Sequence, residues 1–221
     1  NLVITGLRGV GKTVLLDSLK PIAIDKGWFW VGTDLSEATS LSEMSLLVRL
    51  MTDLAVVTSG IAIGEPQQKW FVGSPTPPET LDFGHLVEIG DGAPGLHSDK
   101  LKAVLEVVWE CVEALGMRGV VFAYDEAQNL ADHVENNEYP LSMLLEVFQS
   151  LQRKGMRLFL VLTGLPTLFA RLVEARTYAE RMFRILVLEK LSREDTADAI
   201  LKPIEDASCP VKFGQESIDA I

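Results

Sequence analysis

Short apolar segments alternate along the chain with segments whose apolar residues recur every three to four positions. The short runs, rich in β-branched, aromatic or leucine residues, predict strands over 2–5, 28–33, 119–124, 158–163 and 185–188. Helical spacing predicts helices over 11–19, 44–57, 100–116, 141–154 and 167–175. We expect Pro21 to stop or kink the first helix and Gly27 to mark the next turn. Strands that alternate with helices imply a parallel sheet covered on both faces.

Two regions break this alternation. Residues 60–98 hold seven of the 17 glycines and five of the 10 prolines, so we expect an insertion or long surface excursion there, which could include a hairpin. After residue 190 the pattern is all helical, over 193–204 and again from 215. We therefore divide the chain into an α/β core over 1–190 and the truncated start of a helical lid over 191–221. Because the chain begins on a strand and ends inside an apparent helix, we expect it to be a piece of a longer protein.

Composition places the chain among globular proteins. Its 221 residues, 48% of them hydrophobic and 23% charged, can bury a core, which excludes a disordered or low-complexity protein. A net charge of -11 disfavours nucleic-acid binding over most of the surface, so DNA could bind only through a local basic patch or through other domains. The two cysteines and the lack of a long apolar segment indicate a reducing compartment and no membrane span. We expect a cytoplasmic location.

The first strand leads into a glycine-rich segment that matches the pattern G-x-x-x-x-G-K-[ST]. Its residues are Gly6, Leu7, Arg8, Gly9, Val10, Gly11, Lys12 and Thr13. Glycines allow the positive φ angles that turn successive N–H groups inward, and the N-terminus of the following helix adds partial positive charge. Such a loop binds the phosphates of a nucleotide. We expect Lys12 to reach the β- and γ-phosphates and the Thr13 hydroxyl to ligate Mg²⁺.

A pair of carboxylates follows the strand over 119–124. Asp125 and Glu126 come at the carboxyl end of this strand, the edge where open α/β sheets bind ligands. Asp125 would hold Mg²⁺ through water or the Thr13 hydroxyl, and Glu126 would orient and deprotonate an attacking water. Acidic residues also follow strands as helix N-caps, so the pair indicates catalysis only together with the phosphate-binding segment.

Two further positions are candidates with alternatives left open. Thr163 ends the strand over 158–163 and either points at the γ-phosphate or the lytic water, or caps the turn before Pro166. Residues 151–190 hold eight Lys or Arg against three Glu, a positive balance within an acidic chain. Arg181 is the candidate arginine finger, donated to the nucleotide of a neighbouring subunit in a homo-oligomer. The alternative for Arg181 is a solvated or salt-bridged helix face.

These motifs, in this order, resemble those of the AAA+ ATPases, which are P-loop NTPases, and more narrowly bacterial ATP-binding proteins similar to initiator and origin-recognition ATPases. The matching stretches are 6–13, 124–130, 162–166 and 178–183. The resemblance implies a three-layer α/β/α sandwich whose parallel five-stranded sheet has the order 5-1-4-3-2. It also implies Walker A roles for Lys12 and Thr13, Walker B roles for Asp125 and Glu126, a sensor 1 role for Thr163 and a finger role for Arg181. The family often has Asn where this chain has Thr163.

The expected function is Mg²⁺-dependent hydrolysis of ATP, coupled to a conformational change or to assembly, with ATP and ADP as ligands. A STAND-like signalling ATPase, in which nucleotide exchange acts as a switch with little turnover, fits the same Walker pair. A P-loop kinase is disfavoured because residues 60–98 contain no Arg-rich lid and because Glu126 suits water activation. A GTPase is less favoured still, since an N-K-x-D base-reading motif is absent.

Overall fold

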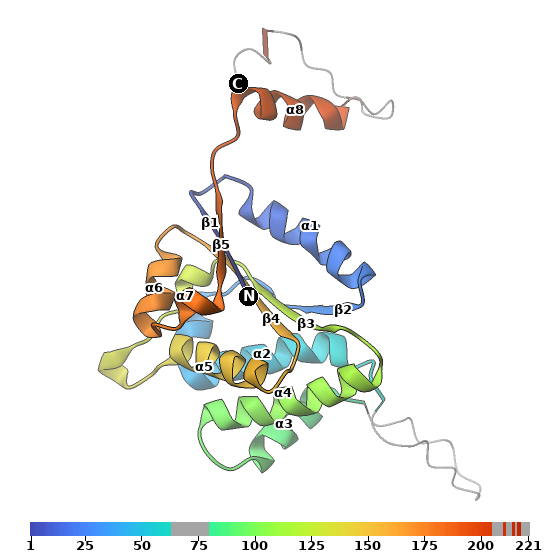
Figure 1. Cartoon of the computed structure of the whole chain (residues 1–221), viewed down its shortest axis with the longest axis vertical. Helices are drawn as coiled ribbons and strands as arrows, with labels where there is room; N and C mark the ends of the chain where they lie inside the picture. Colours follow the sequence, from blue (N-terminus) through green and yellow to red (C-terminus); the bar gives the residue numbers. More distant parts are fainter. Residues whose placement is uncertain (63–79, 205–209, 211–213, 215, 218–221) are drawn as a thin grey trace, which may run out of the picture.

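A parallel five-stranded sheet with the order β2-β3-β4-β1-β5 forms the centre of the protein (Figure 1). The structure is a computed structural model that describes residues 1–62, 80–204, 210, 214 and 216–217. The strands are β1 (Leu2–Gly6), β2 (Trp28–Val31), β3 (Gly119–Tyr124), β4 (Leu158–Gly164) and β5 (Arg184–Leu188). This is the expected order. It places β4 between β1 and β3, the strands that lead into the glycine-rich segment and the acidic pair.

Helices cover the two faces of the sheet unequally. On one face lies α1 (Lys12–Asp25), where Leu16 packs with Ile4 and Val161. The other face carries the larger core, under α2 (Glu43–Thr58), α4 (His97–Ala114) and α5 (Pro140–Arg153). The arrangement is the three-layer α/β/α sandwich that was expected.

Shorter elements complete the described chain. β4 connects to β5 through α6 (Leu168–Ala175) and α7 (Ala179–Met182), and α8 (Arg193–Ile204) stands beyond the end of β5 (Figure 1). The 3-10 turns are η1 (Glu37–Ser40), η2 (Ala127–Asn129) and η3 (Val134–Asn136). Of the helix expected from residue 215, only residues 216–217 are described. None of the helices in the described ranges is long and apolar enough to cross a membrane.

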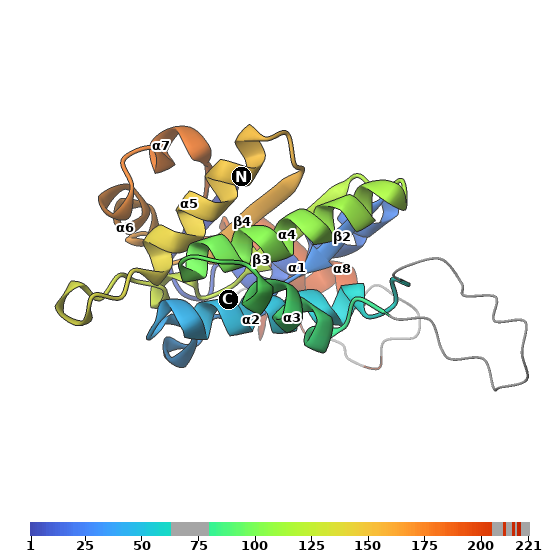
Figure 2. The same cartoon turned by 90° about the horizontal axis from the view of Figure 1, so that it is seen from below.

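The expected surface excursion is wrong for residues 81–98. There α3 (Phe83–Gly92) packs against α2 and α4 (Figure 2), and Leu81 and Leu86 are fully buried. Glycines hid the helical pattern because they have low helix propensity, but Gly90 is buried where α3 meets Met51 of α2 and Val104 of α4. The most Pro-rich part of the segment, residues 63–79, lies outside the described residues.

We expected Pro21 to stop or kink the first helix, and the structure excludes the stop. The helix continues to Asp25 with Pro21 inside it, and Gly27 follows at a φ angle of 77°. A proline removes only one backbone donor from a helix, and the helix extends beyond Pro21 in spite of that loss. The Lys26 N–H closes the last turn by donating to the carbonyl oxygen of Ala23 at 3.1 Å.

The packing of β3 against α5 generates a prediction for stability. Phe122 and Phe148 are fully buried and meet edge to face, with ring centroids 5.0 Å apart. Phe148→Ala removes most of a buried ring and leaves a cavity, so we expect it to lower the free energy of unfolding by about 3–5 kcal/mol. The measurement is urea unfolding followed by circular dichroism. Val56→Ala, at a position of α2 that is 77% exposed, is the control, and equal losses in the two variants would contradict the prediction.

Candidate functional site

The glycine-rich segment makes a tight turn between β1 and α1. Gly9 and Gly11 have φ angles of 80° and 89°, in the left-handed region that favours glycine. Gly11 is the N-cap of α1 and has no side chain with which to cap the first turn. The N–H groups of that turn and the positive end of the helix dipole therefore remain available to an anion, as in phosphate-binding loops.

Lys12 is buried inside this loop although it is charged. Its Nζ donates hydrogen bonds to the carbonyl oxygens of Gly6 at 3.0 Å and Leu7 at 2.8 Å. These two acceptors offset the loss of hydration of the ammonium group. They hold the positive charge next to the N-terminus of α1.

Asp125 joins three elements at the carboxyl edge of the sheet. It follows β3 directly and is only 4% exposed. The Thr13 hydroxyl, from the first turn of α1, donates to one oxygen of its carboxylate, and the Thr163 hydroxyl, from β4, donates to the other. The Glu126 N–H also donates to the Asp125 Oδ1, at 2.8 Å. Thr163 is fully buried, and its hydroxyl bonds to Asp125 rather than to the turn before Pro166.

The pKa of Asp125 lies below its usual value. Burial alone raises this pKa, because it disfavours the charged form, but the hydrogen bonds from Thr13, Thr163 and the Glu126 N–H outweigh it, together with the charge of Lys12. The carboxylate is therefore ionised at neutral pH, which is the form that binds a metal ion.

Glu126 lies exposed beside Asp125. Its φ angle of 51° is in the left-handed region, which is uncommon for a residue other than glycine, and it turns the chain from β3 into η2. Its carboxylate accepts a hydrogen bond from the side-chain amide of Gln128. No role for Gln128 was predicted from the sequence. The available signal was an amide side chain two residues beyond the acidic pair.

The segment after β2 fixes the backbone of Asp125. The Asp125 N–H donates to the Thr33 carbonyl oxygen at 3.2 Å, and the Leu35 N–H donates to the Asp125 carbonyl oxygen at 3.0 Å. Arg49 of α2 donates to the Thr33 hydroxyl and pairs with Asp53 at 2.8 Å. Burial raises the pKa of Asp53, which the charge of Arg49 opposes. This support was not predicted from the sequence, because it joins residues far apart along the chain.

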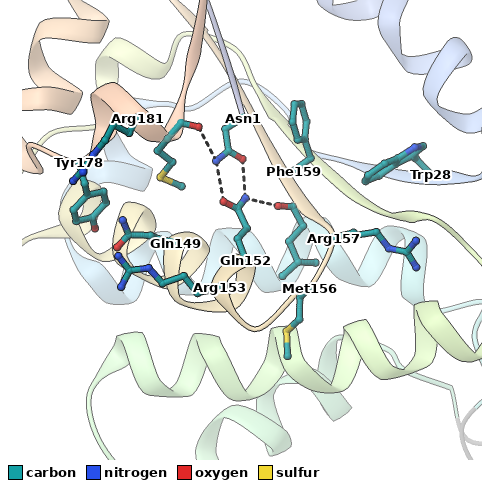
Figure 3. A pocket seen from close by; sticks show the side chains of 12 residues that line it. Asn1, Trp28, Gln149, Gln152, Arg153, Met156, Arg157, Phe159, Tyr178 and Arg181 are labelled. Carbon is teal, nitrogen blue, oxygen red and sulfur yellow. Dashed lines mark hydrogen bonds between the residues drawn. The ribbon is translucent and has the colours of Figure 1, made fainter.

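Arg181 lies at the amino-terminal ends of the strands, opposite the end of the sheet that carries the glycine-rich segment and Asp125. It belongs to α7, which precedes β5, and the first residue of β5 aligns with the first residue of β1. The last residue of β5 aligns with Gly6, where the glycine-rich segment begins. Arg181 lines a cavity of about 600 Å³ with Asn1, Trp28 and Arg153 (Figure 3). Because β1 and β2 begin at this cavity, Arg181 is remote from the glycine-rich segment of its own chain.

The structure thus brings most of the predicted site residues to one edge of the sheet. Those that meet there are the loop residues 6–13, with Lys12 and Thr13, and the strand-end residues Asp125, Glu126 and Thr163. Arg181 is the predicted residue that lies elsewhere.

This edge fits Mg²⁺ bound together with phosphates. Mg²⁺ prefers oxygen ligands and is commonly held by one or two protein groups plus water and phosphate. The Thr13 hydroxyl and the Asp125 carboxylate present two such oxygens in contact with each other. Among the described residues, no group of three or more His, Cys, Asp or Glu could hold a metal ion by itself.

Comparison with known proteins identifies the fold. The sequence matches no protein-family model and has no significant match among curated proteins. Among solved structures, Cdc6p from Pyrobaculum aerophilum is similar at 16% identity and a TM-score of 0.56, over 92% of this chain and 42% of that protein. The ORC2 protein of Aeropyrum pernix in its ADP form is similar at 14% identity and a TM-score of 0.52, over 92% of this chain and 46% of that protein. The chain has the Cdc6/ORC2 fold.

The Cdc6/ORC2 fold confirms the predicted fold class and agrees with the resemblance drawn from the motifs. The chain spans less than half the length of both proteins, at 42% and 46%. Structural similarity at such low sequence identity shows the fold alone. The candidate site is identified from the geometry at the carboxyl edge of the sheet.

The bond from Thr163 to Asp125 generates a prediction that depends on pH. Thr163→Val removes a hydrogen bond to a buried charge, so we expect the free energy of unfolding to fall by about 1.5–3 kcal/mol at pH 7. The bond lowers the pKa of Asp125 in the folded state. Its contribution is therefore present above the unfolded pKa, about 3.9, and is lost as the pH falls through the lower folded value.

The measurement is chemical unfolding of both proteins between pH 7 and pH 3. The cost of Thr163→Val should shrink over this range. Thr52→Val is the control, because the Thr52 hydroxyl is exposed on α2 and donates only to the Val48 carbonyl oxygen of its own helix. A cost of Thr163→Val that is independent of pH would contradict the assigned bond.

Proposed function

We propose that this chain binds ATP with Mg²⁺ and hydrolyses it, and that hydrolysis is coupled to a conformational change or to assembly. The observation that carries the proposal is the ionised Asp125 carboxylate, held between Thr13 of the glycine-rich loop and Thr163 of β4. P-loop NTPases use this combination of a phosphate loop and a strand-end acid. A protein of the same fold, the Aeropyrum pernix ORC2 protein, has an ADP form, which supports a nucleotide as the ligand.

Each residue at this edge has a role in the proposed binding step. The N–H groups of the loop and of the first turn of α1 bind phosphate oxygens. Lys12 exchanges its bonds to the loop carbonyls for bonds to the β- and γ-phosphates. Thr13 and Asp125 would hold the Mg²⁺, which when bound would neutralise negative charge on the phosphates. Thr163 orients Asp125 and is the candidate sensor of the γ-phosphate.

Glu126 is the proposed general base. Its carboxylate is exposed at the end of β3, next to Asp125, where an attacking water can reach it. The water oxygen bonds to the γ-phosphorus, the bond from that phosphorus to the bridging oxygen breaks, and ADP leaves. The proton of the water passes to Glu126, so the products are ADP and inorganic phosphate.

Arg181 has a place in this proposal only within an assembly. Since it lies at the opposite edge of the sheet, it would contact a nucleotide that is bound to a neighbouring copy. Arginine supplied in this way stabilises charge in the transition state of phosphoryl transfer.

Lys12 provides the test of nucleotide binding. We expect Lys12→Ala to weaken the binding of ATP with Mg²⁺ by about 10- to 100-fold, because a charge-assisted bond to phosphate is lost. The measurement is calorimetric titration with ATP and, separately, GTP. Lys20→Ala is the control, since Lys20 lies exposed on the same helix. Equal affinities of the two variants would contradict the role of the loop.

Glu126 provides the test of hydrolysis. We expect Glu126→Gln to bind ATP within about threefold of the unaltered protein and to lower kcat by about 10²- to 10⁴-fold, because the general base is lost. The measurement is release of inorganic phosphate over many turnovers, with Glu113→Gln, at an exposed position of α4, as the control.

Two other outcomes would redirect the proposal. Unchanged turnover in Glu126→Gln would remove Glu126 from its role. Assembly that depends on ATP in an unaltered protein with negligible turnover would instead support a STAND-like switch.

A further inference from the structure

We infer that Gln128 is a positioning residue, which orients the carboxylate of Glu126 and ties it to the end of β4. The inference rests on the proposed function of Glu126 as general base and deepens it. Gln128 lies in η2, the short turn that follows the acidic pair. Its side chain is partly buried and reaches back over the carboxyl edge of the sheet.

Both ends of the Gln128 amide are occupied. The Nε2 donates to the Oε2 of Glu126, and the Oε1 accepts a hydrogen bond from the Leu165 N–H at 3.1 Å. An amide has a donor and an acceptor in one plane, so these two bonds together fix the orientation of that plane. Leu165 follows directly after β4. The carboxylate of Glu126 is therefore joined to the turn at the end of β4.

The backbone of Gln128 is anchored separately. Its carbonyl oxygen accepts a hydrogen bond from the Arg171 guanidinium of α6, at 2.7 Å. The preceding residue, Ala127, is buried, and its carbonyl oxygen accepts from the Leu130 N–H at 3.1 Å. The turn therefore does not depend on the amide of Gln128 alone, and that amide is available to orient Glu126.

Gly164 leaves the space in which the Gln128 side chain lies. A Cβ added at Gly164 would lie 2.6 Å from the Gln128 Oε1 and 2.9 Å from the Leu168 Cδ2. Both distances are too short for a real contact, so a larger residue at this position would displace the Gln128 amide from its bonds and also press on the buried Leu168 side chain. The position of the Gln128 amide thus depends on the absence of a side chain at Gly164.

The contact has a direct consequence for the proposed reaction. Gln128 engages one oxygen of the Glu126 carboxylate and leaves the other to accept a proton from water. Thr163 and Leu165, on either side of Gly164, hold Asp125 and Gln128 respectively. A shift at the end of β4 would therefore move Asp125, the proposed metal ligand, and Glu126, the proposed base, together.

Gln128→Glu separates positioning from mere support of the turn. The substituted side chain has the same shape and keeps an acceptor for the Leu165 N–H, but it loses the donor to Glu126 and sets a second carboxylate beside it. If Gln128 only supports the turn, Gln128→Glu can lower kcat only through repulsion by the added charge, and that loss shrinks as the salt concentration is raised. If it orients the base, kcat stays low at high salt while the binding of ATP matches that of the unaltered protein under the same conditions.

The experiment is steady-state phosphate release by the full-length protein across ATP concentrations. We expect Gln128→Glu and Gln128→Ala to lower kcat by about 10- to 100-fold, with the KM for ATP within about threefold, because a misplaced reacting group slows the chemical step. In hydrogen exchange, the Leu165 amide should exchange faster in Gln128→Ala than in Gln128→Glu. Gln149→Ala is the matched control, since Gln149 lines the cavity at the other edge of the sheet.

Gly164→Ala tests the same contact from its other side. We expect it to lower kcat as Gln128→Ala does, and to add less than about twofold when both changes are combined, because both remove one contact. Fully multiplied losses in the double variant would overturn the inference.

The outcomes separate this inference from the proposed function. If Glu126→Gln abolishes turnover while Gln128→Glu retains it, the positioning role is overturned and the proposed function stands. If Glu126→Gln retains full turnover, both are overturned.

Discussion

The hydrogen bonds to the Asp125 carboxylate are the interaction on which the rest of the site depends. The group is almost excluded from solvent, so protein donors must replace water around its charge. Two threonine hydroxyls and one backbone N–H supply those donors. Since Thr13 belongs to α1 and Thr163 to β4, one carboxylate connects the helix on one face of the sheet with two central strands. A shift of any of these elements would leave a buried charge short of donors.

The order of the strands makes this convergence possible. β4 lies between β1 and β3, and the register aligns Thr163 with Ile4 on one side and Tyr124 with Leu162 on the other. The three strands therefore end at similar heights, where their loops meet. The segment after β2 adds a further layer of support, because its backbone bonds to both sides of the Asp125 peptide. The site thus lies at the end of the sheet. Arg49 of α2 supports it by donating a hydrogen bond to the Thr33 hydroxyl.

The sequence predicted most of the fold because buried parallel strands are continuous apolar runs, each bounded by glycine or polar residues. All the predicted strands are present, within two residues at their ends. The glycine-rich loop and the acidic pair were predictable for a related reason, since each is a local pattern. The position of Thr163 between them required the strand order, which came from the resemblance and not from spacing. The helix α3 was not predicted because its glycines interrupt the helical spacing of apolar residues. The helix forms nevertheless, because its apolar face packs against α2 and α4. Arg49 acts through a contact between distant segments, for which a single sequence has no signal. The signal for Gln128 was an amide side chain two residues beyond the acidic pair, and its second bond, to Leu165, joins distant segments.

The location of Arg181 limits the symmetry of any assembly that would use it. The glycine-rich loop lies at the carboxyl edge of the sheet and Arg181 at the amino edge, so donor and acceptor surfaces occupy opposite ends of the domain. A two-fold dimer buries the same patch on both copies and could not join such surfaces in both directions at once. Contacts between the arginine of one copy and the loop of the next would be head-to-tail, and their repetition would close into a ring or extend into a filament.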